Sequence, residues 1–205
     1  MKMTPFDAVQ RLAQLPVATV YEAAGKLGDV APHIRPLIDG VKLAGPAFTL
    51  KTMPGDNLAV FAAIDAAPPG SVLVIDGGAS ERVTIWGGTS TVAAKAKGLA
   101  GCITNAAVRD IDEIRAARFP VYAPCTSVRG VSRSHPGWMG IPVCVGDAIV
   151  RPGDLVLGDA DGLLIVPVER VVDIAVAATE RRAAEEAKDA RLRAGESIRS
   201  VLNIA

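Results

Sequence analysis

The sequence has few aromatic residues, few histidines and no excess of charge. Aromatics make up 4% of its 205 residues, histidine occurs twice, and 22 Lys and Arg balance 22 Asp and Glu. A chain without net charge sets up no field that attracts nucleic acid or an anionic membrane, so we expect neither partner. The three cysteines form no CxxC pair, which argues against a zinc knuckle and a disulfide framework. Cys102 and Cys144 lie within apolar runs, where we expect buried thiols.

Common catalytic motifs are missing as well. The sequence contains no GxGxxG after a strand, no GxxxxGK[ST], no GxSxG and no HExxH. His135 lies in a Ser-His-Pro-Gly segment typical of an exposed loop. The start of the chain lacks the pattern of a signal peptide, and no apolar run approaches the roughly 20 residues needed to span a bilayer. We therefore expect a cytoplasmic protein.

Small and branched apolar residues are abundant instead. Half of the chain is hydrophobic and its mean hydropathy is +0.31. This composition is typical of tightly packed α/β layers, and the apolar surplus suggests interfaces between subunits. We interpret residues 1–205 as a single domain, which is long enough to bury its own core.

Two short apolar runs, 71–75 and 101–105, predict strands buried on both faces of a sheet. Helical patterns follow them, at about 89–97 and from 111 to just before Pro120, so we expect βαβ units and a partly parallel sheet. Further signals predict the helix starts Thr4-Pro5 and Thr19 to Glu22, a bulge or sheet edge at Gly45-Pro46 within a strand over 41–53, and a helix cap at Asn57.

The last third of the chain has a different pattern. Residues 123–140 are rich in Gly, Ser and Pro and predict a loop. Four short strands separated by turn residues then predict an antiparallel meander, at 141–145, 148–150, 155–158 and 163–167. An Ala-, Glu- and Arg-rich segment predicts one long helix over about 168–194.

Arg109 and Asp110 form the most informative pair of polar residues, because they follow the buried strand at the edge where α/β sheets gather ligands. The Arg109 guanidinium matches a carboxylate in two hydrogen bonds, and the Asp110 carboxylate suits Mg²⁺ or Mn²⁺. A structural alternative is that Asp110 and Glu113 form an ordinary helix capping box and that Arg109 is a surface residue.

A second cluster, Trp86 to Thr91, precedes a predicted helix one βα unit earlier. Gly87 and Gly88 would leave the backbone amides of the helix start free to hold an anion. The alternative is a plain glycine-rich turn with a Thr or Ser cap. Two such sites at consecutive strand ends would bracket a small anionic ligand.

The sequence resembles the family of the 4-hydroxy-4-methyl-2-oxoglutarate aldolases, which also decarboxylate oxaloacetate, and of the related regulators of ribonuclease activity. The matching segments follow the family's order along nearly the whole chain: 45–49, 55–57, 69–74, 86–88, 107–110, 141–143, 151–154 and 158–162. The resemblance implies an α/β fold of the β/β/α swivelling type, assembled as a homotrimer or a hexamer of two trimers, with active sites between subunits.

The resemblance also implies a mechanism and the residues that carry it. Asp110 would be the metal ligand and Arg109 would contact a 2-oxo acid substrate, while Gly87, Gly88, Thr89 and Ser90 would supply backbone amides. Cleavage of a 4-hydroxy-2-oxo acid first gives a pyruvate enolate, and a divalent cation such as Mg²⁺ or Mn²⁺ would be the electron sink. Loss of CO₂ from oxaloacetate passes through the same enolate.

The chain departs from the family pattern at two places. Gly88 stands where the family often has an acidic residue, and Asn105-Ala106 stands where Asp-Gly is common. A carboxylate from a neighbouring subunit is also expected, for which Glu185 or Glu186 is a candidate. The competing hypothesis is a non-catalytic binding protein of the ribonuclease-regulator type. A Schiff-base aldolase would need a desolvated lysine, whereas Lys95 and Lys97 lie in a segment typical of a solvated helix.

Overall fold

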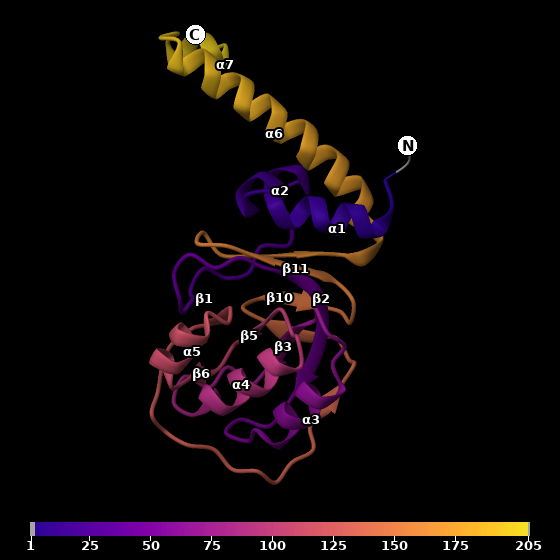
Figure 1. Cartoon of the computed structure of the whole chain (residues 1–205), viewed down its shortest axis with the longest axis vertical. Coiled ribbons are helices and arrows are strands. Elements are labelled where there is room, and N and C mark those ends of the chain that lie inside the picture. Colours follow the sequence, from indigo (N-terminus) through magenta and orange to yellow (C-terminus); the bar gives the residue numbers. More distant parts are fainter. Residues whose placement is uncertain (1–2, 205) are drawn as a thin grey trace.

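A mixed sheet flanked by helices forms the protein in the computed structural model, which describes residues 3–204 (Figure 1). The helices are α1 (Pro5–Gln14), α2 (Val17–Ala23), α3 (Leu58–Ala66), α4 (Gly88–Ala96), α5 (Ile111–Ala117), α6 (Val171–Arg193), preceded by a 3-10 turn (Val168–Arg170), and α7 (Ile198–Leu202). In Figure 1, α1, α2 and α6 stack at one end above β11, while α3, α4 and α5 lie beside the central strands. The predicted α/β fold with a long terminal helix is confirmed.

The main sheet has the strand order β1-β7-β5-β3-β2-β11-β12, and β8 also pairs with β2. Its strands are β1 (Arg35–Pro36), β2 (Leu43–Lys51), β3 (Val72–Asp76), β5 (Gly101–Thr104), β7 (Val121–Ala123), β8 (Trp138–Met139), β11 (Leu155–Gly158) and β12 (Leu163–Val166). Strands β2, β3, β5 and β7 run parallel, with helical connections after β2, β3 and β5, as the βαβ prediction requires. All five residues of β3 are buried, because helices cover one face and the hairpin β9–β10 lies on the other.

Two small sheets complete the fold. Strand β4 (Thr84–Trp86) pairs in parallel with β6 (Ala107–Val108), and β9 (Val143–Val145) pairs antiparallel with β10 (Ala148–Val150). The four strands predicted near the end of the chain form, but as two hairpins, β9–β10 and β11–β12, in different sheets and not as one meander, since β10 does not pair with β11. Strands β4 and β7 were not predicted.

The start of α2 differs from its prediction. Thr19 does not cap the helix; α2 begins two residues earlier, after Pro16. The first amide of α2, from Val17, donates to the Asp159 carboxylate at 2.9 Å, and the Thr19 hydroxyl donates to Glu185 at 2.8 Å. A carboxylate from a distant turn thus satisfies the helix start, which no local capping rule could reveal.

Two other local predictions need correction. Asn57 occupies the cap position of α3, but the Asp56 carboxylate accepts the hydrogen bond from the Leu58 amide at 3.0 Å. Pro46 lies neither at a sheet edge nor at a recorded bulge. It lies where β2 changes partners, because residues 43–46 pair with β11 and residues 47–51 with β3.

Cys102 and Cys144 differ in burial because their side chains lie on different faces of their strands. Cys102 on β5 is fully buried as predicted, whereas Cys144 on β9 is exposed, contrary to the prediction. Residues alternate between the two faces of a strand, and β9 directs Val143 and Val145 inward, which leaves Cys144 outside.

The first half of α6 packs against α1 and α2, and its second half projects beyond the body of the protein (Figure 1). Ion pairs such as Arg181–Glu185 and Arg182–Glu186 line the projecting part. Among the described residues, no helix is both long and apolar enough to cross a membrane.

Candidate active site

The turn between β6 and α5 positions the Arg109–Asp110 pair. Asp110 adopts the left-handed conformation, with φ of 59°, at the cap position of α5, yet its side chain makes no capping hydrogen bond. Its Oδ2 accepts a hydrogen bond from the Gly88 amide at 2.9 Å and lies 3.5 Å from Arg109 Nε. The capping-box alternative for Asp110 is therefore wrong, because the carboxylate faces the neighbouring loop.

The parallel pairing of β4 with β6 brings the two predicted clusters together. Trp86 is the register partner of Val108, and the Arg109 amide donates to the Trp86 carbonyl at 3.1 Å. Gly87, at the start of α4, consequently lies under the Asp110 carboxylate: a Cβ built on Gly87 would be 2.6 Å from Asp110 Oδ2. The absence of a side chain on Gly87 is what allows this approach.

The start of α4 presents free backbone donors beside the carboxylate. The amides in the first turn of a helix have no acceptor within the helix, and here they belong to Gly88, Thr89 and Ser90. Asp110 takes the Gly88 amide, which leaves those of Thr89 and Ser90. The Trp86 indole donates to the Thr91 hydroxyl at 2.8 Å and stacks on Phe119, so the helix start is held in place.

A small hollow of about 40 Å³ lies over these groups. Its lining includes the predicted Gly87, Thr89, Ser90, Arg109 and Asp110, and it adds residues that sequence reasoning missed: Asn57, Phe61, Thr84, Ile85, Trp86, Val131 and Arg133. The Arg133 guanidinium lies 5.3 Å from the Phe61 ring, so two arginines line one hollow. A glycine- and serine-rich loop gave no signal for Arg133, since its place depends on how the loop folds back.

Asn57 is unusual among the lining residues. Its side-chain oxygen is buried and has no hydrogen-bond partner among the described residues. An unsatisfied buried polar atom costs about 1–3 kcal/mol. Its position in the lining of the hollow indicates that a ligand or water supplies the missing partner.

The neighbouring Asp56 has the opposite character. Its carboxylate accepts hydrogen bonds from the amides of Leu58, Ser134 and His135 and from the hydroxyls of Ser132 and Ser134. Burial raises the pKa of this carboxyl, but the hydrogen bonds outweigh burial and hold it well below its ordinary value. Asp56 thereby ties the 123–140 loop to the start of α3, next to the hollow.

Other predicted candidates lie outside the hollow. Lys95 and Lys97 are exposed, and Lys95 donates to the Ala117 carbonyl at 2.6 Å. Asn105 accepts from the Gly77 amide and donates to Asp76, so it links the ends of β3 and β5. Glu185 and Glu186 pair with arginines of their own helix.

The donor set of the hollow suits one kind of metal ion. The described residues contain no group of three or more His, Cys, Asp and Glu side chains able to hold a metal ion. Mg²⁺ keeps several waters and needs only one or two protein carboxylates, whereas Zn²⁺ takes three or four nitrogen or sulfur ligands. The exposed Asp110 carboxylate therefore fits Mg²⁺ or Mn²⁺ and does not fit a tightly enclosed zinc ion.

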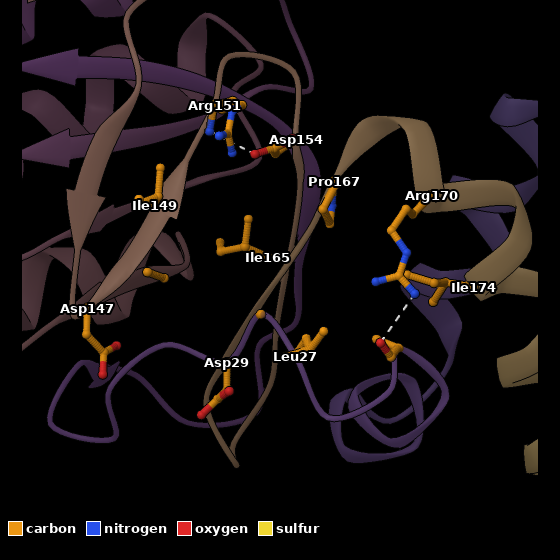
Figure 2. A pocket seen from close by; sticks show the side chains of 13 residues that line it. Leu27, Asp29, Asp147, Ile149, Arg151, Asp154, Ile165, Pro167, Arg170 and Ile174 are labelled. Carbon is orange, nitrogen blue, oxygen red and sulfur yellow. Dashed lines mark hydrogen bonds between the residues drawn. The ribbon is translucent and has the colours of Figure 1, made fainter.

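A larger hollow, of about 410 Å³, lies between the α2–β1 connection, β10 and the start of α6 (Figure 2). Most of its polar groups already serve the fold. Asp154 accepts hydrogen bonds from the amides of Arg151 and Val168, and Arg170 donates to the Ala24 carbonyl. Ile149, Ile165 and Ile174 line it as well, with Ile165 nearest the middle (Figure 2). Asp29 also lines this hollow, and its exposed carboxylate has no hydrogen-bond partner among the described residues.

Solved structures of other proteins share this fold. A solved Pseudomonas syringae protein superposes with a TM-score of 0.84 over 98% of both chains at 21% identity. RraAS2 of Streptomyces coelicolor, described as an unusual member of the RNase ES inhibitor RraA family, gives 0.78 at 28% identity over 91% of this chain and 97% of its own. The protein thus has the RraA fold.

The sequence comparisons define the family. Residues 17–165 match the RraA-like family model, described as Aldolase/RraA. A protein of Halalkalibacterium halodurans named "Putative 4-hydroxy-4-methyl-2-oxoglutarate aldolase" is 31% identical over 92% of this chain and 90% of its own. One of the same name from Burkholderia multivorans is 38% identical over 70% of this chain and 87% of its own. The chain belongs to the RraA-like family.

Proposed function

We propose that the protein is a divalent-metal-dependent pyruvate aldolase that cleaves 4-hydroxy-2-oxo acids and decarboxylates oxaloacetate. The observation that carries this proposal is the Asp110 carboxylate, which does not cap its own helix α5 and instead lies at the start of α4, beside Arg109 and the amides of Thr89 and Ser90. The names of the two aldolase relatives support the same reaction class.

Each group in the hollow has a part in this reaction. Arg109 would bind the substrate carboxylate through two hydrogen bonds, and the amides of Thr89 and Ser90 would hold its oxygens in place. Arg133, which also lines the hollow, suits a second carboxylate and so favours dicarboxylic 2-oxo acids.

Asp110 would hold Mg²⁺ or Mn²⁺, and the bound ion would stabilise the oxygen charge of a pyruvate enolate. The fixed charge of Arg109 would stabilise the same developing charge, because it is already in position before the bond breaks.

A neighbouring copy of the chain is part of this proposal. A volume of about 40 Å³ has room for only a few waters, so one chain by itself offers too small an enclosure for a 2-oxo acid. Exposed apolar side chains such as Val176 on α6 and Ile198 on α7 suit a contact between copies. We propose a homotrimer or hexamer with the site at the contact between subunits.

Pyruvate release from 4-hydroxy-4-methyl-2-oxoglutarate and from oxaloacetate tests the proposed reaction. Chelation with EDTA should abolish turnover and added Mg²⁺ or Mn²⁺ should restore it. Borohydride in the presence of pyruvate should leave activity intact, because no lysine imine forms. Activity that survives EDTA and is lost with borohydride would contradict the metal-dependent reaction.

A non-catalytic regulator is the second candidate function, and two observations favour it. Gly88 brings no side chain to the site, and the likeness to RraAS2 extends over 97% of that protein. A regulator would release no pyruvate from any 4-hydroxy-2-oxo acid or from oxaloacetate at any metal concentration, so the same assay separates the two functions.

A further inference from the structure

Glu113, on the first turn of α5, has an exposed side chain that caps no helix. The third residue of a helix often reaches back to the cap amide, but no side-chain capping bond forms at the start of α5. Within residues 3–204, no hydrogen bond or ion pair engages its carboxylate. The adjacent Asp112, in contrast, pairs with Arg115 at 3.3 Å and its side chain is 99% exposed.

The Glu113 carboxylate instead lies against Gly88. A Cβ built on Gly88 would collide with Glu113 Oε2 and would lie 3.5 Å from Asp110 Cβ. Gly88 has an ordinary backbone conformation, so a side chain there would meet no backbone strain but would have to displace the end of the Glu113 side chain. Gly87 and Gly88 therefore accommodate one carboxylate each, from Asp110 and from Glu113.

The charges at this point are unbalanced. Arg109 is the cation paired with Asp110, at 3.5 Å, and half of its side chain is in solvent. A second carboxylate beside Asp110 adds a negative charge, which the positive end of α5 compensates only in part. Asn57, whose side-chain oxygen is buried without a hydrogen-bond partner among the described residues, lines the hollow beside Asp110 and independently points to an absent ligand.

We propose that Glu113 is the second carboxylate of the cation site, standing over Gly88 and holding a hydrated divalent cation together with Asp110. Glu113 is a positioning residue in this scheme, since it acts through the water around the cation and not on the substrate. The presence of a cation rests on the proposed function. The role of Glu113 adds to that function a second residue that holds the cation.

Mn²⁺ binding, followed by electron paramagnetic resonance of the free ion in the absence of substrate, tests this role. Glu113→Gln should weaken binding about 10-fold to 100-fold, as loss of an outer-sphere partner does. Asp112→Asn is the matched control, because it removes the same charge one residue away from an outward-facing side chain. It should change binding less than about 2-fold.

A relocated carboxylate provides the decisive variant. Gly88→Ala should displace Glu113 and weaken Mn²⁺ binding nearly as much as Glu113→Gln, whereas Gly88→Asp combined with Glu113→Ala should bind within about threefold of wild type. Thermal melts without metal show whether each variant folds, and Glu113→Gln keeps the test valid if the Gly88 variants do not.

The outcomes separate this inference from the proposed function. Equal Mn²⁺ binding by Glu113→Gln and Asp112→Asn would overturn the role of Glu113, even if the wild type is an active aldolase. A wild type that binds Mn²⁺ through Glu113 but releases no pyruvate would contradict the aldolase and leave the cation site standing. Absence of Mn²⁺ binding by the wild type would overturn the cation site, and Glu113's role with it.

Discussion

Two aspartates at the edge of the same hollow differ in how the fold uses them. Asp56 is 3% exposed and its carboxylate accepts five hydrogen bonds from α3 and the 123–140 loop. The Asp110 side chain is 36% exposed and accepts one hydrogen bond, from the Gly88 amide. A saturated carboxylate has no lone pairs left for a ligand, whereas an unsaturated one beside free amides does. Asp56 therefore stabilises the fold, whereas the Asp110 carboxylate remains available to a ligand.

The largest effect expected from this comparison is the loss of activity in Asp110→Asn. Asparagine tolerates the left-handed backbone at this position, so the fold should survive. Loss of the anion that holds the cation should lower pyruvate formation about 100-fold to 1,000-fold. Metal-dependent turnover and a thermal melt measure the two effects separately. Wild-type turnover by a folded Asp110→Asn protein would return the residue to a structural role and favour the regulator.

Asp56→Asn should show the reverse pattern: the free energy of unfolding should fall, while the folded protein should keep most of its turnover. The NH₂ group of asparagine cannot accept the hydrogen bonds that the carboxylate accepts from these amides and hydroxyls. Their loss should lower the free energy of unfolding by about 1.5–3 kcal/mol. Denaturant unfolding at neutral pH measures this cost, and Thr4→Ala, on the far α1 layer, calibrates it with the loss of an ordinary capping bond of about 1 kcal/mol. A variant as stable as wild type would remove the distinction between the two turns.

Acid provides a second measure of the same turn. Because the folded-state pKa of Asp56 lies below its unfolded value of about 3.9, the ionised carboxylate stabilises the fold above that pH. This contribution is lost as the pH falls below it. The free energy of unfolding of Asp56→Asn should therefore fall less than that of the wild type between about pH 5 and about pH 3. Parallel pH profiles would contradict this assignment.

The smallest effect belongs to Arg109→Lys, which retains the charge at the Asp110 turn. Lysine cannot form the two parallel hydrogen bonds of a guanidinium, so we expect KM to rise and kcat to fall, for a combined loss of about 10-fold in kcat/KM. Arg115→Lys, which alters an exposed pair on α5 outside the hollow, is the matched control and should leave both constants unchanged. Equal kinetics for the two variants would remove Arg109 from the substrate's contacts.

Much of the architecture was predictable from local pattern. Five-residue apolar runs gave β3 and β5, the Thr4-Pro5 start gave α1 with its capping box, and the charged segment after Val168 gave α6. These signals are strong because burial on two faces or a regular helical face imposes a residue type at every position. The start of α2 was wrong because Asp159, far along the chain, satisfies its first amide.

The candidate site was likewise predictable only in part. The amino-acid pattern is enough to identify the residues with suitable chemistry: an arginine beside a hard carboxylate, and two glycines before a helix. That Asp110 faces Gly88 instead of capping α5, and that Asn57, Glu113 and Arg133 lie near them, follows from the folded chain alone. Residue type records chemistry, but the pairing of β4 with β6 and the folding of the 123–140 loop decide which groups share one hollow. Those contacts join segments that no local pattern connects.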